Sequence, residues 1–327
     1  MIEEYRRNLS IIIPHYNTPD LLEKLINSIP HIKDIQILVI DDNSNVQLNK
    51  LHALQIQYGS CVEFYKNDTP VKGAGTCRNI GLQHADGKWI LFADADDFFL
   101  EGMYETVRSF FKSDYDQVFF TPTSIYLDTG ELANRHLIFE KRINDYANNP
   151  TRENLLNLKI ATTSPWSCLI KHDLLREHDI WFDEVLYSND IMFMAKVGHY
   201  GKYVAVSKSI IYCITRNKGS LTTYIDWDAF QIRMFEYIRV CQFIKEHYSK
   251  KDMKTMRYTC LGMLYKAMRE HHGISKYIYI IRIFHKSGIP MFSWNQLGLE
   301  RMKQLIREIR TKRLDAKYYM LKNNSDK

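Results

Sequence analysis

The chain has 327 residues, of which 45% are hydrophobic and 25% are charged, close to the averages of globular proteins. This composition excludes a disordered chain, and the 14 glycines and 8 prolines exclude a collagen-like or low-complexity one. The net charge of +6 is uneven: residues 1–230 carry 23 basic and 30 acidic side chains, whereas residues 231–327 carry 21 and 8. The basic end predicts an anionic partner, such as a phospholipid surface or a nucleic acid.

The compartment can be inferred from the cysteines and from the apolar runs. The six cysteines are scattered without a CxxC pair, which indicates reduced thiols in a cytosolic protein rather than a disulfide framework. The first residues lack the apolar stretch of a secretory signal, and no run reaches the roughly 18 apolar residues of a membrane span. We therefore expect a cytoplasmic protein.

The first hundred residues alternate between strand-like and helix-like apolar patterns. We expect strands at 9–14, 35–40, 62–65 and 89–93, separated by helices at about 18–29, before residue 62 and at 75–85. Such alternation predicts a mainly parallel sheet with helices on both faces. Shorter strands follow at 117–121, 124–127 and 203–214, and residues 226–327 are expected to be mainly helical. The fold class is therefore α/β with a C-terminal helical extension.

An acidic cluster, Asp94-Ala95-Asp96-Asp97, directly follows the fourth expected strand. Its carboxylates would repel each other unless a hard cation such as Mg²⁺ or Mn²⁺ neutralised them. In proteins such ions are commonly held by one or two carboxylates together with substrate phosphates. The alternative interpretation is a solvated acidic turn at the start of a helix.

Other polar segments should lie at the same edge of the sheet, because ligands of parallel sheets bind beyond the carboxyl ends of the strands. Pro14 to Asn17 and Asp41 to Ser44 each end a strand. Between them in the predicted site, residues 72–81 form a glycine-containing loop that opens a helix and presents Arg78. Backbone N–H groups and a guanidinium suit a diphosphate.

Taken together, these segments resemble the inverting family-two glycosyltransferases, which have the GT-A fold and use nucleotide sugars. The matching segments, in chain order, are Ile11–Asn17, Val39–Ser44, Gly73–Leu82, Ile90–Asp97, Trp166–Glu184, Tyr187–Phe193 and Arg216–Thr222. The resemblance covers about residues 8–225. It implies a catalytic domain over 1–225, with a nucleotide-sugar half at about 1–125 and an acceptor half at about 126–225, followed by a basic region over 226–327.

The resemblance also implies roles for particular residues on the donor side. Asp42, with Asp41 beside it, would bind the nucleotide base, near Pro14 and Tyr16. Arg78 would lie near the ribose or the diphosphate.

The acidic cluster and the acceptor half would carry the chemistry. Asp94 would contact the ribose and Asp96 would ligate Mn²⁺ or Mg²⁺, with Asp97 adjacent as a second metal contact. Asp190, preceded by Asn189, would be the general base, because the acceptor hydroxyl must lose a proton as it attacks. The alternative for this pair is a simple helix cap.

Asn189 and two further residues are implied as acceptor or phosphate contacts. Arg216 takes a place where many relatives have another metal or phosphate contact. Trp166 is expected either to stack on a sugar or to pack in the core.

The implied reaction moves a hexose or N-acetylhexosamine from UDP to a hydroxyl of a saccharide acceptor, as in capsule, O-antigen or lipooligosaccharide synthesis. Two alternatives stay open: a nucleotidyltransferase of similar fold, which would release pyrophosphate, and a non-catalytic glycan-binding scaffold.

The basic end of the chain contains two amphipathic segments, residues 274–286 and 301–313. Helices of this kind favour an anionic membrane surface, and a lipid-linked acceptor at the inner face of the cell membrane would explain them. The alternative is that they pack on the catalytic domain or form a homodimer interface. We expect no nucleic-acid binding, because no RNA- or DNA-binding motif is visible.

Overall fold

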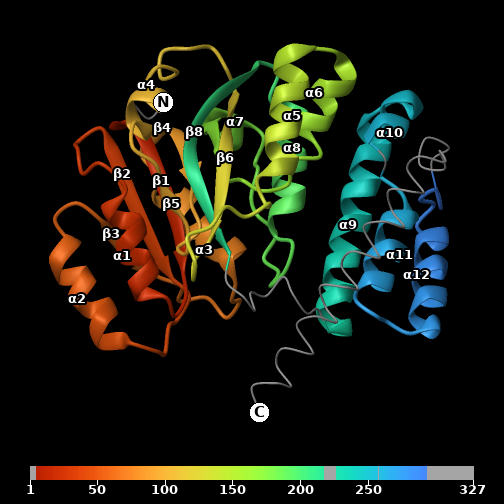
Figure 1. Cartoon of the computed structure of the whole chain (residues 1–327), viewed down its shortest axis with the longest axis horizontal. Helices are drawn as coiled ribbons and strands as arrows, with labels where there is room; N and C mark the ends of the chain where they lie inside the picture. The colour runs from red at the N-terminus through yellow and green to blue at the C-terminus, as the bar shows by residue number, and fades with distance from the viewer. Residues whose placement is uncertain (1–4, 217–225, 257, 293–327) are drawn as a thin grey trace. The chain divides into compact units, whose positions relative to one another are not determined.

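The computed structural model describes residues 5–216, 226–256 and 258–292 (Figure 1). The chain divides into two compact units, Met1–Thr223 and Tyr224–Lys327, close to the boundary expected after residue 225. The expected helix at 301–313 lies outside the described residues.

The first unit contains one eight-stranded sheet, in the order β3-β2-β1-β4-β7-β6-β8-β5. Its strands are β1 (Arg7–His15), β2 (Ile35–Asp41), β3 (Glu63–Lys66), β4 (Gly87–Phe92), β5 (Phe98–Phe99), β6 (Gln117–Tyr126), β7 (Cys168–Lys171) and β8 (Val204–Arg216). Its helices are α1 (Pro19–Asn27), α2 (Leu48–Tyr58), α3 (Ala74–His84), α4 (Met103–Arg108), α5 (Leu137–Asn148), α6 (Arg152–Lys159), α7 (His172–Glu177) and α8 (Asp190–Tyr200).

The four strands expected in the first hundred residues are confirmed, and β3, β2, β1 and β4 are parallel. The rest of the sheet is mixed: β7 runs antiparallel to both β4 and β6, while β6 and β8 are parallel. The β1–β2 register pairs His15 with Asp41, so both strands end at one edge. This is the edge where the polar segments were expected to meet.

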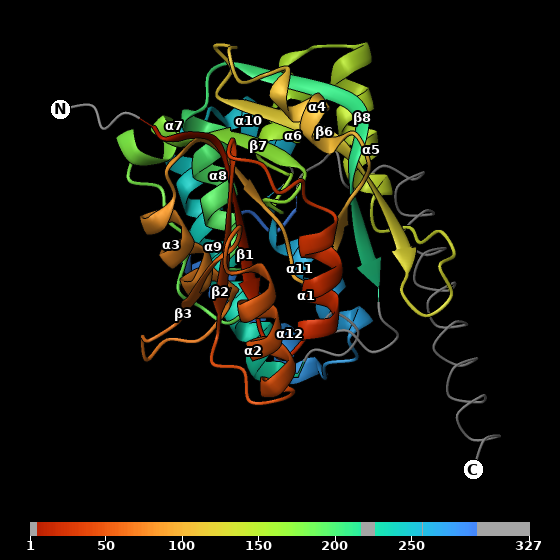
Figure 2. The same ribbon diagram turned by 90° about the vertical axis from the view of Figure 1, so that its left-hand side faces the viewer.

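Helices cover both faces of the sheet. On β1, residues Leu9, Ile11 and Ile13 point into a core with α1, α2 and α4, whereas Ile12 points into a second core with α3 and α8. Alternate side chains of a strand face opposite sides, so an apolar run buries both faces at once. Figure 2 shows α1 and α3 on opposite sides of β1 and β2.

The strands expected at 117–121 and 124–127 are a single strand, β6, with register shifts on both sides of Thr121 where it pairs with β8. Pro122 lies at this point and has no N–H to donate to the ladder, which accounts for an irregularity rather than an end. The sequence indicated a break because proline is usual between strands.

The second unit is helical, as expected, with α9 (Trp227–His247), α10 (Lys250–Met256), α11 (Cys260–Arg269) and α12 (Ile274–Lys286). Phe230, Met234 and Ile238 of α9 are buried. All six cysteines of the chain are free thiols. In the described ranges, no helix is both long and apolar enough to cross a bilayer.

Candidate active site

The ends of β1 and β2 are joined by hydrogen bonds to Asp41. His15 Nδ1 donates to Asp41 Oδ1 over 2.9 Å, while its Nε2 accepts the Thr18 backbone N–H at 3.2 Å. Ser44 donates to Oδ1 from its Oγ at 2.5 Å and to Oδ2 from its backbone N at 3.0 Å. Burial acts to raise the pKa of Asp41, but the hydrogen bonds from His15 and Ser44 outweigh it and lower the pKa. Asp41 is therefore an ionised anchor of the turn after β2.

Asp42 fixes the loop that leads into α3. Its Oδ1 accepts from Asn67 Nδ2 at 2.7 Å, and its Oδ2 accepts the backbone N–H of Gly73 at 2.8 Å. Gly73 has φ of 127°, a conformation that favours glycine. Each carboxylate oxygen has a second lone pair, so these bonds leave Asp42 able to accept an N–H of a base.

Arg78, on α3, is buried and joins two motifs that are far apart in the sequence. Its Nη2 donates to Asp94 Oδ1 over 2.6 Å and its Nη1 donates to Asn189 Oδ1 over 3.0 Å. The guanidinium carbon lies 5.2 Å from the ring centroid of Phe182. The end of β4, α3 and the start of α8 therefore meet at one cationic side chain.

The hydrogen bond between Arg78 and Asn189 requires α3 to lie close to the segment before α8. A Cβ added to Gly75 would lie 2.4 Å from the backbone oxygen of Asp183 and 2.8 Å from Asn189 Cβ. No real side chain tolerates these distances, so glycine is needed here for contact between the backbones. The two glycines of the predicted loop thus serve local geometry and packing.

Asp97 is an internal anchor of the acidic cluster, and its contact with a metal stays a prediction. Only 3% of it is exposed. Its Oδ1 accepts the backbone N–H of Thr215 at 2.7 Å and its Oδ2 accepts from the Tyr212 hydroxyl at 2.8 Å. Burial, with the charges of Asp96 and Asp94 adding to it, raises the pKa of Asp97. Both oxygens accept hydrogen bonds from β8 in a buried position, which makes Asp97 less accessible to a cation than Asp96.

Asp96 has the opposite surroundings, because its side chain is exposed. Desolvation by the protein behind it and the charge of Asp94 raise the pKa of Asp96 to about 6, against the opposing charge of Arg135. Thr215 Oγ1 donates to the Asp96 carbonyl oxygen at 2.6 Å, which holds the backbone of the cluster while leaving the carboxylate open.

Asn189 and Asp190 begin α8, yet Asn189 does not cap it. Its side chain makes no capping hydrogen bond and instead accepts from Arg78. Desolvation raises the pKa of Asp190 to about 6, although the Arg78 charge acts to lower it. A carboxylate whose pKa lies near 6 is largely ionised at neutral pH and still basic enough to take a proton.

The remaining residues predicted for the donor side lie at the end of β1. Tyr16 is 48% exposed and Pro14, within β1, is partly buried. Arg216 ends β8, and its Nη1 donates to Asn134 Oδ1 at 3.1 Å.

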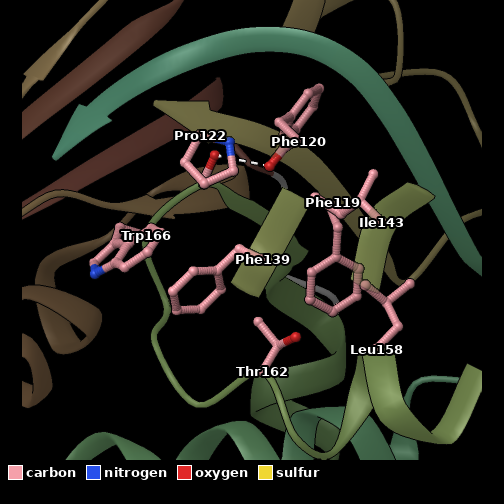
Figure 3. A pocket seen from close by; sticks show the side chains of 9 residues that line it. Phe119, Phe120, Pro122, Phe139, Ile143, Leu158, Thr162 and Trp166 are labelled. Carbon is pink, nitrogen blue, oxygen red and sulfur yellow. Dashed lines mark hydrogen bonds between the residues drawn. The ribbon is translucent and has the colours of Figure 1, made fainter. Parts of the chain in front are cut away.

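Trp166 lies in the core, with 4% of its surface exposed. Its ring centroid is 4.5 Å from that of Phe139 and 5.9 Å from that of Tyr212, to which it is nearly parallel. Figure 3 shows Trp166 and Phe139 at one side of a cavity whose volume is about 10 Å³. A space of this size holds at most a water molecule. Of the two predicted roles for Trp166, the packing role fits the structure and sugar stacking does not. Trp181, by contrast, is 39% exposed.

Tyr212 and Thr215 of β8 are the site residues that the sequence did not reveal. The Tyr212 hydroxyl donates to Asp97 and accepts the backbone N–H of Asp94 at 2.9 Å. β8 lies more than a hundred residues from β4 in the chain. No spacing or motif in the sequence predicts the contact between β8 and the acidic cluster that follows β4. Arg135, near Asp96 and Asp190, was missed for the same reason.

The acidic cluster fits a divalent cation through one residue. Arg78 holds one oxygen of Asp94, and β8 holds both oxygens of Asp97, so Asp96, which is exposed, is the most accessible carboxylate of the cluster. Across the part of the chain that the structure describes, no three His, Cys, Asp or Glu side chains form a metal site by themselves. One carboxylate suits a cation whose other ligands are the phosphates of a substrate and water.

Comparison with known proteins identifies the family. Residues 10–179 match the family described as "Glycosyl transferase family 2". Over 113 residues the chain is 33% identical to the GalNAc(5)-diNAcBac-PP-undecaprenol beta-1,3-glucosyltransferase of Campylobacter jejuni, which covers 34% of this chain and 37% of that protein. Over 225 residues it is 27% identical to the poly(ribitol-phosphate) beta-N-acetylglucosaminyltransferase TarS of Staphylococcus aureus, covering 64% of this chain and 36% of TarS.

The matched regions thus span just over a third of the length of these two relatives. The fold is similar to that of a solved structure, S. aureus TarS 1–349 in complex with UDP-GlcNAc. That comparison has a TM-score of 0.65 at 19% identity and covers 94% of this chain and 88% of that one. The family match takes in about half of the chain, including β1 to β4 and the acidic cluster. This chain belongs to glycosyl transferase family 2 and has the GT-A fold.

Proposed function

We propose that this chain transfers a hexose or N-acetylhexosamine from a UDP-sugar to a hydroxyl of a saccharide acceptor, with inversion at the anomeric carbon. The observation that carries the proposal is the pair of hydrogen bonds by which Arg78 joins Asp94 to Asn189. They bring the acidic cluster, suited to a cation and a diphosphate, next to the carboxylate best suited to act as base. The UDP-GlcNAc in complex with TarS supports a UDP-linked donor.

In the proposed reaction, Asp190 accepts the proton of the acceptor hydroxyl while its oxygen attacks the anomeric carbon. The bond between that carbon and the diphosphate breaks, and its electron pair leaves with UDP. Attack from the face opposite UDP turns an α-linked donor into a β-linked product. A divalent cation at Asp96 would supply positive charge to the departing diphosphate. Arg78 fixes the positions of Asp94 and Asn189 relative to each other.

We further propose a lipid-linked surface glycan as the acceptor, with the reaction at the inner face of the cell membrane. Support comes from the names of the relatives, one acting on an undecaprenol-linked oligosaccharide and another on poly(ribitol-phosphate). The basic, amphipathic end of the chain is the second support, since anionic lipids attract such segments.

The donor is tested by thermal unfolding with UDP-glucose, UDP-galactose, UDP-GlcNAc and UDP-GalNAc, with and without Mn²⁺. A ligand that binds only the folded state raises the Tm by mass action, so we expect one UDP-sugar to raise it, and more so with Mn²⁺. Asp96→Ala should abolish the added effect of Mn²⁺, while wild-type protein with GDP-mannose serves as the control.

Two outcomes would contradict the proposal. The absence of a shift with every UDP-sugar would exclude this donor class. Release of pyrophosphate instead of UDP during turnover would identify a nucleotidyltransferase.

A further inference from the structure

The last part of the connection between α7 and α8, residues 182–189, ends directly before Asp190 and is called the base loop below. Its ends lie close together, because the backbone N–H of Asp183 donates to the Asn189 carbonyl oxygen at 3.2 Å. Ser188, near the end of the base loop, has φ of 57°, a left-handed conformation that is unfavourable for a residue with a Cβ. Local preference therefore does not account for the conformation that presents Asp190, and contacts with other elements must hold it.

Asn79, on α3, holds the start of the base loop. Its Nδ2 donates to the Phe182 carbonyl oxygen at 3.0 Å, and its Oδ1 accepts the Phe182 backbone N–H at 2.9 Å. Both residues are buried, so these backbone groups need partners within the protein. One amide side chain thus pairs with the donor and the acceptor of a single residue, as a neighbouring strand would, and fixes both its position and its direction.

The ring of Phe182 connects this hydrogen-bonded pair to α8. It stacks on Phe193 with the ring centroids 3.8 Å apart and the planes 10° from parallel. It also meets the ring of Phe92, at the end of β4, edge-on at 5.0 Å. Phe193 follows Asp190 by three residues, within one turn of α8. Because a packed interior transmits displacements, a shift of Phe182 would move the first turn of α8, and Asp190 with it, relative to β4.

The neighbour of Asn79 holds the other end of the base loop, since Arg78 donates to the side chain of Asn189. Arg78 and Asn79 are adjacent, so both ends of the base loop are tied to one turn of α3. The middle of the base loop also approaches this helix: a Cβ added to Gly73 would lie 3.4 Å from the Val185 carbonyl oxygen. The start of α3 is therefore the common support of the base loop.

We propose that Asn79 is a positioning residue for sugar transfer, which acts through Phe182 to keep the Asp190 carboxylate within reach of the acceptor hydroxyl. Both polar atoms of its side chain bind the backbone of Phe182, so its role is to hold the base loop rather than to contact a substrate. The inference rests on the proposed function, because Asp190 needs a precise position only if it takes that proton. Proton transfer requires hydrogen-bond distance, and a misplacement of about 1 Å can lower a rate by about 10²-fold.

The test is a double-mutant cycle of Asn79→Ala and Asp190→Asn in the full chain. UDP release from UDP-glucose, UDP-galactose, UDP-GlcNAc and UDP-GalNAc is measured with Mn²⁺ and with water as the acceptor. Asn79→Ala should lower kcat by about 10-fold to 10²-fold in the wild-type background. In the Asp190→Asn background it should lower kcat by less than about 2-fold, because the group that it positions is already lost. Calorimetry should show UDP affinity unchanged within about 2-fold.

Asn154→Ala is the matched control. The Asn154 side-chain amide also donates two hydrogen bonds to the backbone, to the carbonyl oxygens of Asp145 at 3.1 Å and Asn149 at 2.9 Å, but it lies on α6 and does not contact the base loop through them. Thermal unfolding shows whether each variant is folded. If Asn79→Ala does not fold, Asn79→Asp takes its place, because it has nearly the same size and keeps an oxygen that can accept the Phe182 N–H.

A loss of kcat that disappears in the Asp190→Asn background, with UDP affinity retained, supports the inference. Equal losses in both backgrounds overturn it, as does a loss no greater than that of Asn154→Ala. Unchanged kcat with weakened UDP binding also overturns it and assigns Asn79 to the donor side. All of these outcomes leave the proposed function intact. If the wild type releases UDP from none of the four donors, the proposed function fails, and the inference that rests on it fails as well.

Discussion

Two carboxylates of the site, Asp96 and Asp190, have pKa values raised to about 6. Desolvation is the main cause for both, so the ionised forms are less stable in the folded protein than in the unfolded chain. The folded state then binds more protons than the unfolded one between about pH 4 and pH 6. Over this range the free energy of unfolding falls as the pH rises. The site therefore carries a stability cost at neutral pH, which is expected of a residue kept as a base.

Asp190→Asn should separate activity from stability. Loss of the base should lower kcat by about 10²–10⁴-fold, because general base catalysis contributes on that order. The amide has no charge to desolvate, so the Tm of the variant at pH 7.5 should be higher than that of the wild type. Transfer assays and thermal unfolding measure the two effects on the same sample. Near-wild-type turnover would remove Asp190 from the mechanism.

The pH profile provides a second readout of the same residue. With donor and Mn²⁺ saturating, Asp96 should stay ionised, so the fall of kcat toward acid should report Asp190 alone. We expect kcat of the wild type to fall tenfold per pH unit below about pH 6, rather than below the ordinary range near 4. Residual activity of Asp190→Asn should lack this fall, and a profile identical to the wild type's would contradict the assignment.

At this scale the sequence predicted candidate residues, of which the structure brings Arg78, Asp94 and Asn189 together, but it did not predict which side chains are exposed and which are enclosed. Asp96 and Asp97 are adjacent and chemically identical, yet one is exposed and the other is enclosed by β8. Trp166 could not be assigned either, because burial of an aromatic side chain depends on elements far away in the sequence, here Tyr212 and Phe139. Local patterns identify residue types at strand ends, but they do not reveal which partners enclose them.

Among the elements, β8 has the strongest influence on the acidic cluster. The Tyr212 hydroxyl bridges the backbone N–H of Asp94 and the carboxylate of Asp97, and its ring stacks on Trp166. Thr215 holds the cluster at two further atoms. The backbone of the acidic cluster and the Asp97 carboxylate are thus held by a strand that does not carry Asp190, the predicted base.

Tyr212→Phe should lower both stability and cation affinity. Removal of the hydroxyl leaves the buried Asp97 Oδ2 without its donor, a loss of about 1–3 kcal/mol in the free energy of unfolding. A less constrained cluster should also raise the Mn²⁺ concentration needed for half-maximal transfer. Denaturant unfolding and Mn²⁺ titration measure these effects.

Tyr104→Phe is the matched control for this change. It also removes a tyrosine hydroxyl that donates to a carboxylate, that of Asp34 at 2.7 Å, but Tyr104 lies on α4, outside the acidic cluster. We expect a smaller loss of stability and no change in Mn²⁺ dependence. Equal effects of the two substitutions on Mn²⁺ dependence would show that Tyr212 has no special part in positioning the cluster.

The elements of the first hundred residues were predictable, because β1, β2 and β4 bury both faces and so appear as apolar runs. The strands after residue 116 were harder to predict. β7 is short and antiparallel, and β6 continues through Pro122, so neither follows the pattern of a parallel strand. The pairing of β6 and β7 depends on contacts between segments that are distant in the sequence. The hydrophobic periodicity of a single segment does not reveal such contacts.

At the scale of the whole chain, the excess of basic residues after residue 230 includes those of α12 in the second unit, a helix that also exposes apolar side chains. On α12, Ile274, Ile278 and Ile281 are 76%, 46% and 40% exposed and recur at the spacing of one helix face. The same helix carries Lys276, and Arg282 and Lys286 follow near its end. Exposed apolar residues beside basic ones are typical of helices that bind the surface of an anionic membrane.

We therefore expect the full chain to co-sediment with vesicles of phosphatidylglycerol and phosphatidylcholine, more weakly as salt is raised, since salt screens such attraction. Ile278→Glu should reduce the partition constant about tenfold, because it removes an apolar side chain from the lipid contact and adds a repelled charge. Ile56→Glu, which changes an isoleucine of α2 that is 72% exposed, is the control and should leave binding unchanged. Equal binding of the two variants would assign the exposed face of α12 to something other than lipid.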